Sequence, residues 1–99
     1  MILVAGHFRI PLEHLGAARP LMREVIAATH REDGCLSYSY AEDVSEPGLI
    51  RVMETWRDRT CLDAHFQTPH MARWVAERAE FGLYDRNIRL WDVDEGEAL

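Results

Sequence analysis

The stretch that decides the fold runs from residue 35 to residue 57 and reads CLSYSYAEDVSEPGLIRVMETWR. Around Tyr38, larger side chains alternate with cysteine and serine, and this period of two predicts a strand over residues 35–44. The Pro-Gly pair at 47–48 occupies the two central positions of a type II turn. A second strand is expected over residues 49–57. Because the connection is short, the two strands should form an antiparallel hairpin.

Each side of the hairpin adds one helical segment and one strand. Apolar residues recur at helical spacing between the N-terminal strand and the hairpin, and again between the hairpin and the C-terminal strand. Pro20 interrupts the first helical pattern and predicts a kink or a late start, and Thr68-Pro69 divides the second pattern into two pieces. The expected elements are a strand over 2–10, a helix over 12–32, strands over 35–44 and 49–57, a helical segment over 58–81 and a strand over 86–93.

This order, β-α-β-β-α-β, is typical of the ferredoxin-like α+β fold. We therefore expect one domain over residues 1–99, in which a four-stranded antiparallel sheet carries two helical segments on one face. The strands are apolar on both sides, whereas two helices cover only one face of a sheet. An uncovered apolar face predicts a homodimer through the sheet faces. The alternative is a monomer with an apolar sheet surface, and the sequence leaves open which face meets the helices.

The charge of the chain excludes several classes of function. The 99 residues include 11 basic and 17 acidic side chains, for a net charge of −6, and every basic residue is arginine. Without lysine, Schiff-base chemistry and a phosphate-binding P-loop are excluded. An acidic chain predicts no nucleic-acid partner, and no segment predicts a membrane span. The two cysteines form no CxxC motif and are expected as free thiols in a cytoplasmic protein.

Four short motifs resemble the antibiotic biosynthesis monooxygenase family. They are Glu32-Asp33-Gly34-Cys35 followed by Tyr38, the strand end Glu54-Thr55-Trp56, Ala64-His65-Phe66, and Thr68-Pro69-His70. The resemblance implies a dimeric α+β barrel that uses neither metal nor flavin. It also implies a cofactor-independent monooxygenase, which oxidises an electron-rich phenol, quinol or polyketide aromatic with O₂. Some proteins on the same fold bind or degrade haem. The alternative is therefore a non-catalytic dimeric barrel that binds haem or another hydrophobic ligand.

Five residues are candidates for the site. His65 is the predicted base, because histidine titrates near neutral pH. Trp56 is expected to shape a substrate pocket, and His70, His7 and Asn87 to orient a small aromatic substrate. No metal site is expected, since His65 and His70 lie five residues apart and no cysteine cluster or HExxH motif accompanies them. The alternative for His65 is a packed core histidine.

Glu54 has the same strand parity as Trp56. If that side of the strand faces the interior, Glu54 is a buried carboxylate that needs a hydrogen-bond donor, and an arginine is expected to supply it.

Overall fold

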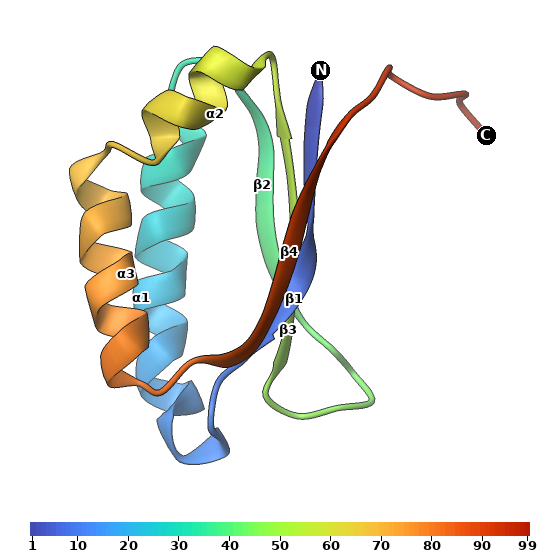
Figure 1. Ribbon diagram of the computed structural model, residues 1–99. Helices are drawn as coiled ribbons and strands as arrows, with labels where there is room; N and C mark the ends of the chain where they lie inside the picture. The colour runs from blue at the N-terminus through green and yellow to red at the C-terminus, as the bar shows by residue number, and fades with distance from the viewer.

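The hairpin predicted from residues 35–57 forms the end of a four-stranded sheet in the computed structural model, which describes residues 1–99 (Figure 1). The sheet order is β2-β3-β1-β4, and all neighbouring strands are antiparallel. The elements are β1 (Ile2–Arg9), α1 (Leu12–His30), β2 (Cys35–Glu42), β3 (Leu49–Trp56), α2 (Arg59–His65), α3 (Pro69–Glu80) and β4 (Tyr84–Asp92). This is the ferredoxin-like βαββαβ fold that the sequence predicts.

All helices lie on one face of the sheet, with α1 and α3 side by side (Figure 1). The second helical segment is two helices, because the Thr68 side chain accepts a hydrogen bond from the Met71 amide and Pro69 occupies the first position of α3. The expected late start of α1 is wrong, since the helix begins at Leu12 and runs through Pro20. Its buried stripe, which includes Met22 and Val25, holds the helix against the sheet despite the missing donor.

Gly34 lies in the turn between α1 and β2. Its φ of +79° is left-handed, and a Cβ atom there would lie 2.3 Å from the Sγ atom of Cys61. Glycine is thus required both by the backbone conformation and by the close approach of α2. The turn brings Glu32, at the end of α1, beside the first residues of β2 and the α2 helix. Cys35 and Cys61 are free thiols, as predicted.

The inner face of the sheet carries most of the core. Phe8, Ile50, Val52 and Trp56 are all buried against the helices. None of the helices is both long enough and apolar enough to cross a membrane.

The outer face of the sheet has no helix over it. Ala5 in β1 pairs with Met53 in β3, and Leu3 pairs with Trp91 in β4. Met53 is 56% exposed and Trp91 is 45% exposed. Leu49 is an exception to the predicted alternation, because it is buried within the chain.

Candidate active site

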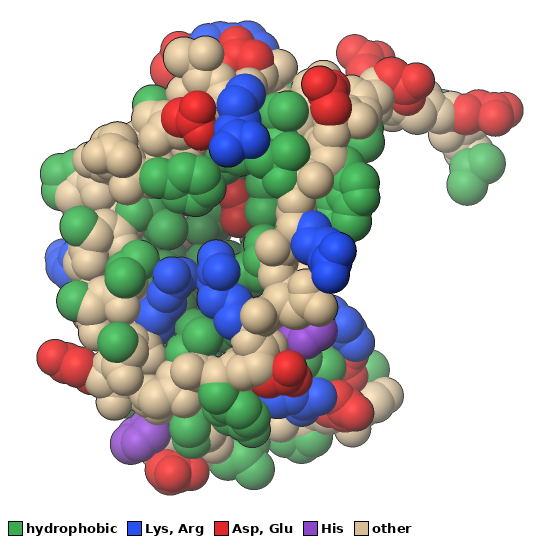
Figure 2. All heavy atoms as spheres, in the orientation of Figure 1, with side chains coloured by type: hydrophobic (Ala, Val, Ile, Leu, Met, Phe, Trp, Pro, Cys, Tyr) green, Lys and Arg blue, Asp and Glu red, His purple; other side chains and the backbone are tan.

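A cavity lies between the inner face of the sheet and the helices α2 and α3, and it opens beside β4. Its volume is about 140 Å³. Figure 2 looks into this hollow, where basic side chains lie near the opening and an acidic side chain is visible in its depth. Most of the wall is apolar, and the polar lining residues are Tyr38, Tyr40, Glu54, Arg78, Arg86 and Arg89. An apolar cavity with a few polar side chains is typical of a small-molecule site.

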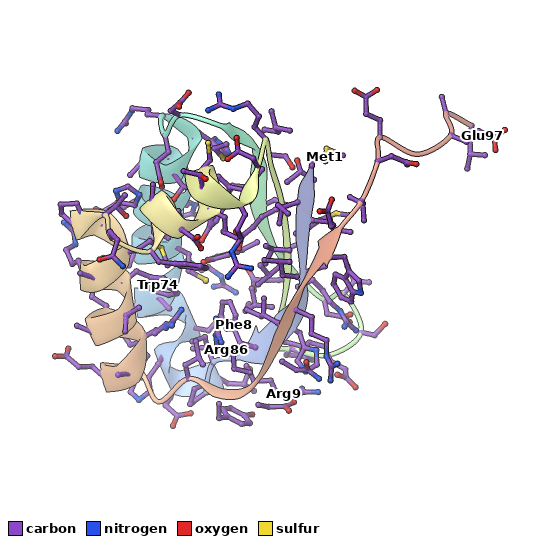
Figure 3. The ribbon with its side chains drawn as sticks, turned by 45° about the horizontal axis from the view of Figure 1, so that its top comes forward. Met1, Phe8, Arg9, Trp74, Arg86 and Glu97 are labelled. Carbon is purple, nitrogen blue, oxygen red and sulfur yellow. The ribbon has the colours of Figure 1, made fainter.

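Strand alternation places three of these side chains on the inner face. Tyr38 and Tyr40 share one side of β2, and Glu54 in β3 pairs directly with Tyr38. Arg86 extends from β4 into the space between the sheet and the helices, where Phe8 also lies (Figure 3). Arg78 completes the cavity from α3.

Glu54 is the buried acid of the cavity and is only 7% exposed. Its Oε1 atom accepts a hydrogen bond of 3.0 Å from Trp56 Nε1. Burial raises the pKa of Glu54 to about 7, although the Trp56 hydrogen bond and the charge of Arg86 act in the opposite direction. The expectation of an arginine donor is wrong. Trp56 is the donor because, two residues away on the same strand face, its ring lies within direct reach of Glu54.

The two tyrosines form a hydroxyl pair beside Glu54. Tyr38 Oη and Tyr40 Oη lie 2.8 Å apart, and either can be the donor. Burial raises the pKa of both hydroxyl groups, so both keep their protons at neutral pH. Because one hydroxyl donates to the other, one hydroxyl hydrogen of the pair remains to donate to an oxygen atom in the cavity, whereas Glu54 can take up a proton.

A second polar cluster joins the end of α1 to α2 and α3. Glu32 Oε2 accepts from two imidazole nitrogens, His65 Nδ1 at 2.6 Å and His70 Nε2 at 2.8 Å. His65 is 1% exposed, and its ring packs against Trp56 and Tyr38 with ring centroids 4.8 and 5.4 Å away. Burial lowers the pKa of His65 despite the nearby carboxylate, so the neutral imidazole is favoured.

The ligand atoms of Glu32, His65 and His70 all lie within 4.8 Å of one another. Their spacing in the sequence does not predict this, because the break at Thr68-Pro69 turns α3 so that both histidines reach one carboxylate. Two imidazoles and a carboxylate are ligands that zinc accepts. In this structure, however, one carboxylate oxygen already pairs with both rings, which ties three segments of the chain together.

The structure therefore brings together three of the five predicted site residues. Trp56 is fully buried and holds Glu54, while His65 and His70 share Glu32. None of the three lines the cavity beside Glu54.

His7 and Asn87 lie elsewhere. They pair across β1 and β4, and strand parity places both side chains on the outer face of the sheet. His7 Nε2 lies 3.7 Å from an Asp85 carboxylate oxygen.

Comparison with known families gives the assignment. The sequence profile described as antibiotic biosynthesis monooxygenase matches residues 1–77. The chain belongs to the antibiotic biosynthesis monooxygenase family. The matched segment contains Glu54 and Trp56 of β3, the tyrosine pair and both histidines of the Glu32 cluster. It ends before Arg78 and β4, so both Arg78 and Arg86 lie outside the matched segment.

Relatives of this family have similar sequences and structures. The chain is 31% identical to the uncharacterised protein sll1783 of Synechocystis over 98 residues, which cover 99% of this chain and 67% of that protein. It is 36% identical to Rv0793 of Mycobacterium tuberculosis, named as a monooxygenase, over 80% of this chain and 77% of Rv0793. A Deinococcus radiodurans structure assigned to the antibiotic biosynthesis monooxygenases superposes with a TM-score of 0.93 at 26% identity, covering 100% of this chain and 98% of the other.

Proposed function

We propose that this member of the antibiotic biosynthesis monooxygenase family oxidises an electron-rich phenol or quinol with O₂, without a cofactor, in the cavity beside Glu54. One observation carries the proposal: a buried carboxylate whose pKa is raised to about 7 lines an apolar cavity. A base with a pKa near the working pH is effective in proton transfer. The Escherichia coli relative YgiN, 27% identical over 78% of this chain and 81% of its own length, is named as a quinol monooxygenase.

The proposed reaction starts with removal of a phenolic proton by the Glu54 carboxylate. The phenolate gives one electron to O₂, and the resulting radical and superoxide combine at a ring carbon. The O–O bond of that peroxide then breaks with loss of water and leaves a new carbonyl group. A hydroquinone and one O₂ thus give one hydroxyquinone and one water, and Glu54 returns the proton it accepted. An apolar cavity favours this chemistry because it keeps bulk water away from the anion.

The tyrosine pair has a supporting role in this proposal. Tyr38 and Tyr40 keep their protons, so a hydroxyl group can donate a hydrogen bond to the phenolate oxygen as its charge develops. Trp56 holds the carboxylate of Glu54 through its indole N–H. The assignment of His65 as the base remains a prediction from the sequence, and its Nδ1 atom is engaged by Glu32.

The test is oxygen uptake by the purified protein with a panel of substituted hydroquinones and anthrones. We expect one O₂ consumed per quinone formed. In Glu54→Gln, turnover should fall by roughly 10²–10⁴-fold, the usual contribution of a positioned base. Glu42→Gln is the matched control, because Glu42 is an exposed partner of Arg19. No uptake with any substrate, together with tight binding of a hydrophobic ligand, would instead favour the non-catalytic binding protein.

We further propose that two copies pair through the outer face of the sheet. The support is the uncovered row that includes Leu3, Ala5, Met53 and Trp91. Light scattering should give about 23 kDa, twice the chain mass of 11.5 kDa. Met53→Arg should shift the mass toward one chain, whereas Val75→Arg, an equally apolar and exposed position on α3, should leave it unchanged. A single-chain mass for the unmodified protein at high concentration would contradict the dimer.

The cytoplasmic location also remains a proposal. Its support is the pair of free thiols, Cys35 and Cys61, which is typical of a reducing compartment. Fractionation of cells that produce the protein would test it.

A further inference from the structure

Three arginines without a carboxylate partner line the cavity, and one of them, Arg89, hydrogen-bonds to the Asn87 side chain. Arg78 and Arg86 both line it, and neither forms an ion pair or a side-chain hydrogen bond with the protein. Five of the eleven arginines have no carboxylate partner, and three of these five, Arg78, Arg86 and Arg89, line this one cavity. Six of the eleven arginines do pair with a carboxylate: Arg9, Arg19, Arg51, Arg57, Arg59 and Arg73.

The two guanidinium groups also lie close enough to disfavour each other. Burial lowers the pKa of Arg78, and the charge of Arg86 lowers it further. Both groups still carry their charge at neutral pH, since arginine does not lose its proton in proteins. Water still solvates the exposed Arg86, whereas Arg78 is half-buried and has lost part of its hydration, so an anion in the cavity would stabilise its charge. The only carboxylate that lines the cavity is Glu54, and it lies outside ion-pair distance of either arginine.

Hydrogen-bond donors outnumber acceptors among the polar side chains that line the cavity. The buried indole N–H of Trp74, on α3, lies beside the Tyr40 hydroxyl, and the two rings pack with centroids 6.4 Å apart. Tyr38 and Tyr40 remain protonated as well. The polar surface around the cavity therefore suits a ligand that carries negatively charged oxygen atoms.

The positions of the charges define how such a ligand would lie. Glu54 is buried in the depth of the cavity, whereas Arg86 is exposed at the β4 edge, where it reaches toward the helices (Figure 3). A cavity of about 150 Å³ accommodates one benzene ring, and this one has about 140 Å³. A single ring fits between the carboxylate and the arginines.

We propose that the substrate is an acidic aromatic: a phenol or quinol whose ring also carries a carboxylate, with the hydroxyl group toward Glu54 and the carboxylate on Arg78 and Arg86. This inference rests on the proposed function for the role of the hydroxyl group. The arginine pair supplies the selectivity, since a guanidinium binds a carboxylate through two parallel hydrogen bonds. A neutral quinol offers the two guanidinium groups no anion to bind.

Binding without turnover tests this proposal. Titration calorimetry under nitrogen compares 2,5-dihydroxybenzoate with 2,5-dihydroxybenzamide, which has the same shape and no charge. We expect the carboxylate to bind at least about tenfold more tightly, as charge-assisted hydrogen bonds imply. Arg86→Gln and Arg78→Gln should each weaken binding of the carboxylate by about tenfold and leave the amide unchanged. Arg86 is exposed, so Arg86→Gln tests the proposal even if Arg78→Gln folds poorly.

The control is Arg51→Gln, which removes an arginine from the outer face of the sheet and should leave both affinities unchanged. Equal affinity for the two probes, no detectable binding of either, or equal weakening of both by Arg86→Gln would overturn the proposal. Because no O₂ is present, the result is independent of catalysis. Tight, arginine-dependent binding of the benzoate without oxygen uptake in air would overturn the proposed oxidation alone.

Discussion

Two carboxylates with little exposure lie on the helix side of the sheet, and their surroundings differ. Glu32 accepts hydrogen bonds from both His65 and His70, so its carboxylate finds its partners within the chain. Glu54 accepts one hydrogen bond from Trp56 and lines a cavity whose cations are unpaired. A closed network of partners stabilises a fold, whereas unpaired charges around a cavity leave room for a ligand. On this difference we propose that the Glu32 cluster stabilises the fold and that the Glu54 cavity is the site of the chemistry.

The largest expected effect is the pH dependence of turnover. Glu54 acts as a base only when ionised, and its pKa is raised to about 7. We therefore expect kcat/KM to fall as the pH drops below 7, by about tenfold per unit and about 100-fold by pH 5. Oxygen uptake between pH 5 and 9 measures this profile. Glu54→Gln should have low activity and no such limb, and a limb that survives in Glu54→Gln would assign the base to another residue.

The second prediction concerns His65→Ala. Because His65 is buried, packs on Trp56 and pairs with Glu32, its loss should destabilise the fold by roughly 1–3 kcal/mol. Urea unfolding measures this change. Turnover per folded molecule should change little. A folded variant with unchanged stability and a turnover loss of 100-fold would identify His65 as the base. The chemistry would then lie at the Glu32 cluster and not at the Glu54 cavity.

The two clusters should also differ in the pH dependence of stability. The pKa of Glu54 is raised from an ordinary value of 4.5 to about 7, so its contribution to stability is present below 4.5 and is lost as the pH rises through 7. The pKa of His65 is lowered from 6.5, so its contribution is present above 6.5 and is lost on further acidification. Urea unfolding at several pH values measures the free energy of unfolding. Glu54→Gln should remove a decrease of this free energy with rising pH, and His65→Gln should remove an increase. Slopes of the same sign would contradict these assignments.

His70→Ala should have a smaller effect than His65→Ala. The His70 side chain is 24% exposed, and Glu32 keeps the hydrogen bond from His65 when it is lost. The free energy of unfolding should fall by about 0.5–1.5 kcal/mol, the net worth of one hydrogen bond. The same urea experiment measures it. A larger loss of unfolding free energy than in His65→Ala would show that the partly exposed His70 ring contributes more to the stability of the Glu32 cluster than the buried His65 ring.

The smallest expected effect is that of metal removal. Glu32 already pairs with both histidines, and none of the three residues lines the cavity. Oxygen uptake should be the same before and after dialysis against EDTA. Loss of activity that one specific divalent metal restores would assign the Glu32 cluster as a catalytic metal site.

The sequence predicted the fold well because its main determinants are local. Alternation in residues 35–57, the Pro-Gly turn and the Thr68-Pro69 helix start all act over a few residues, and each appears in the structure. The motif residues Trp56, His65 and His70 lie close together in the structure, and their role in a substrate site stays a prediction. These features depend on spacing along the chain, which a single sequence displays.

The composition of the site was harder to predict because it depends on contacts between distant segments. Glu32 meets His65 across 33 positions, and Arg78 from α3 and Arg86 from β4 line one cavity only because the fold places these two elements on either side of it. Both sheet faces are rich in apolar residues, so alternation did not show which face meets the helices. His7 and Asn87 were therefore grouped with Trp56, although their strand parity places them on the other face.

The most direct test of the central claim is a crystal structure of the protein with 2,5-dihydroxybenzoate bound in the absence of O₂. The account predicts electron density for the ring in the cavity between β4 and α3, with a hydroxyl group within hydrogen-bond distance of Glu54. Density for the ring beside His65 and His70, or on the outer face beside His7 and Asn87, would contradict it.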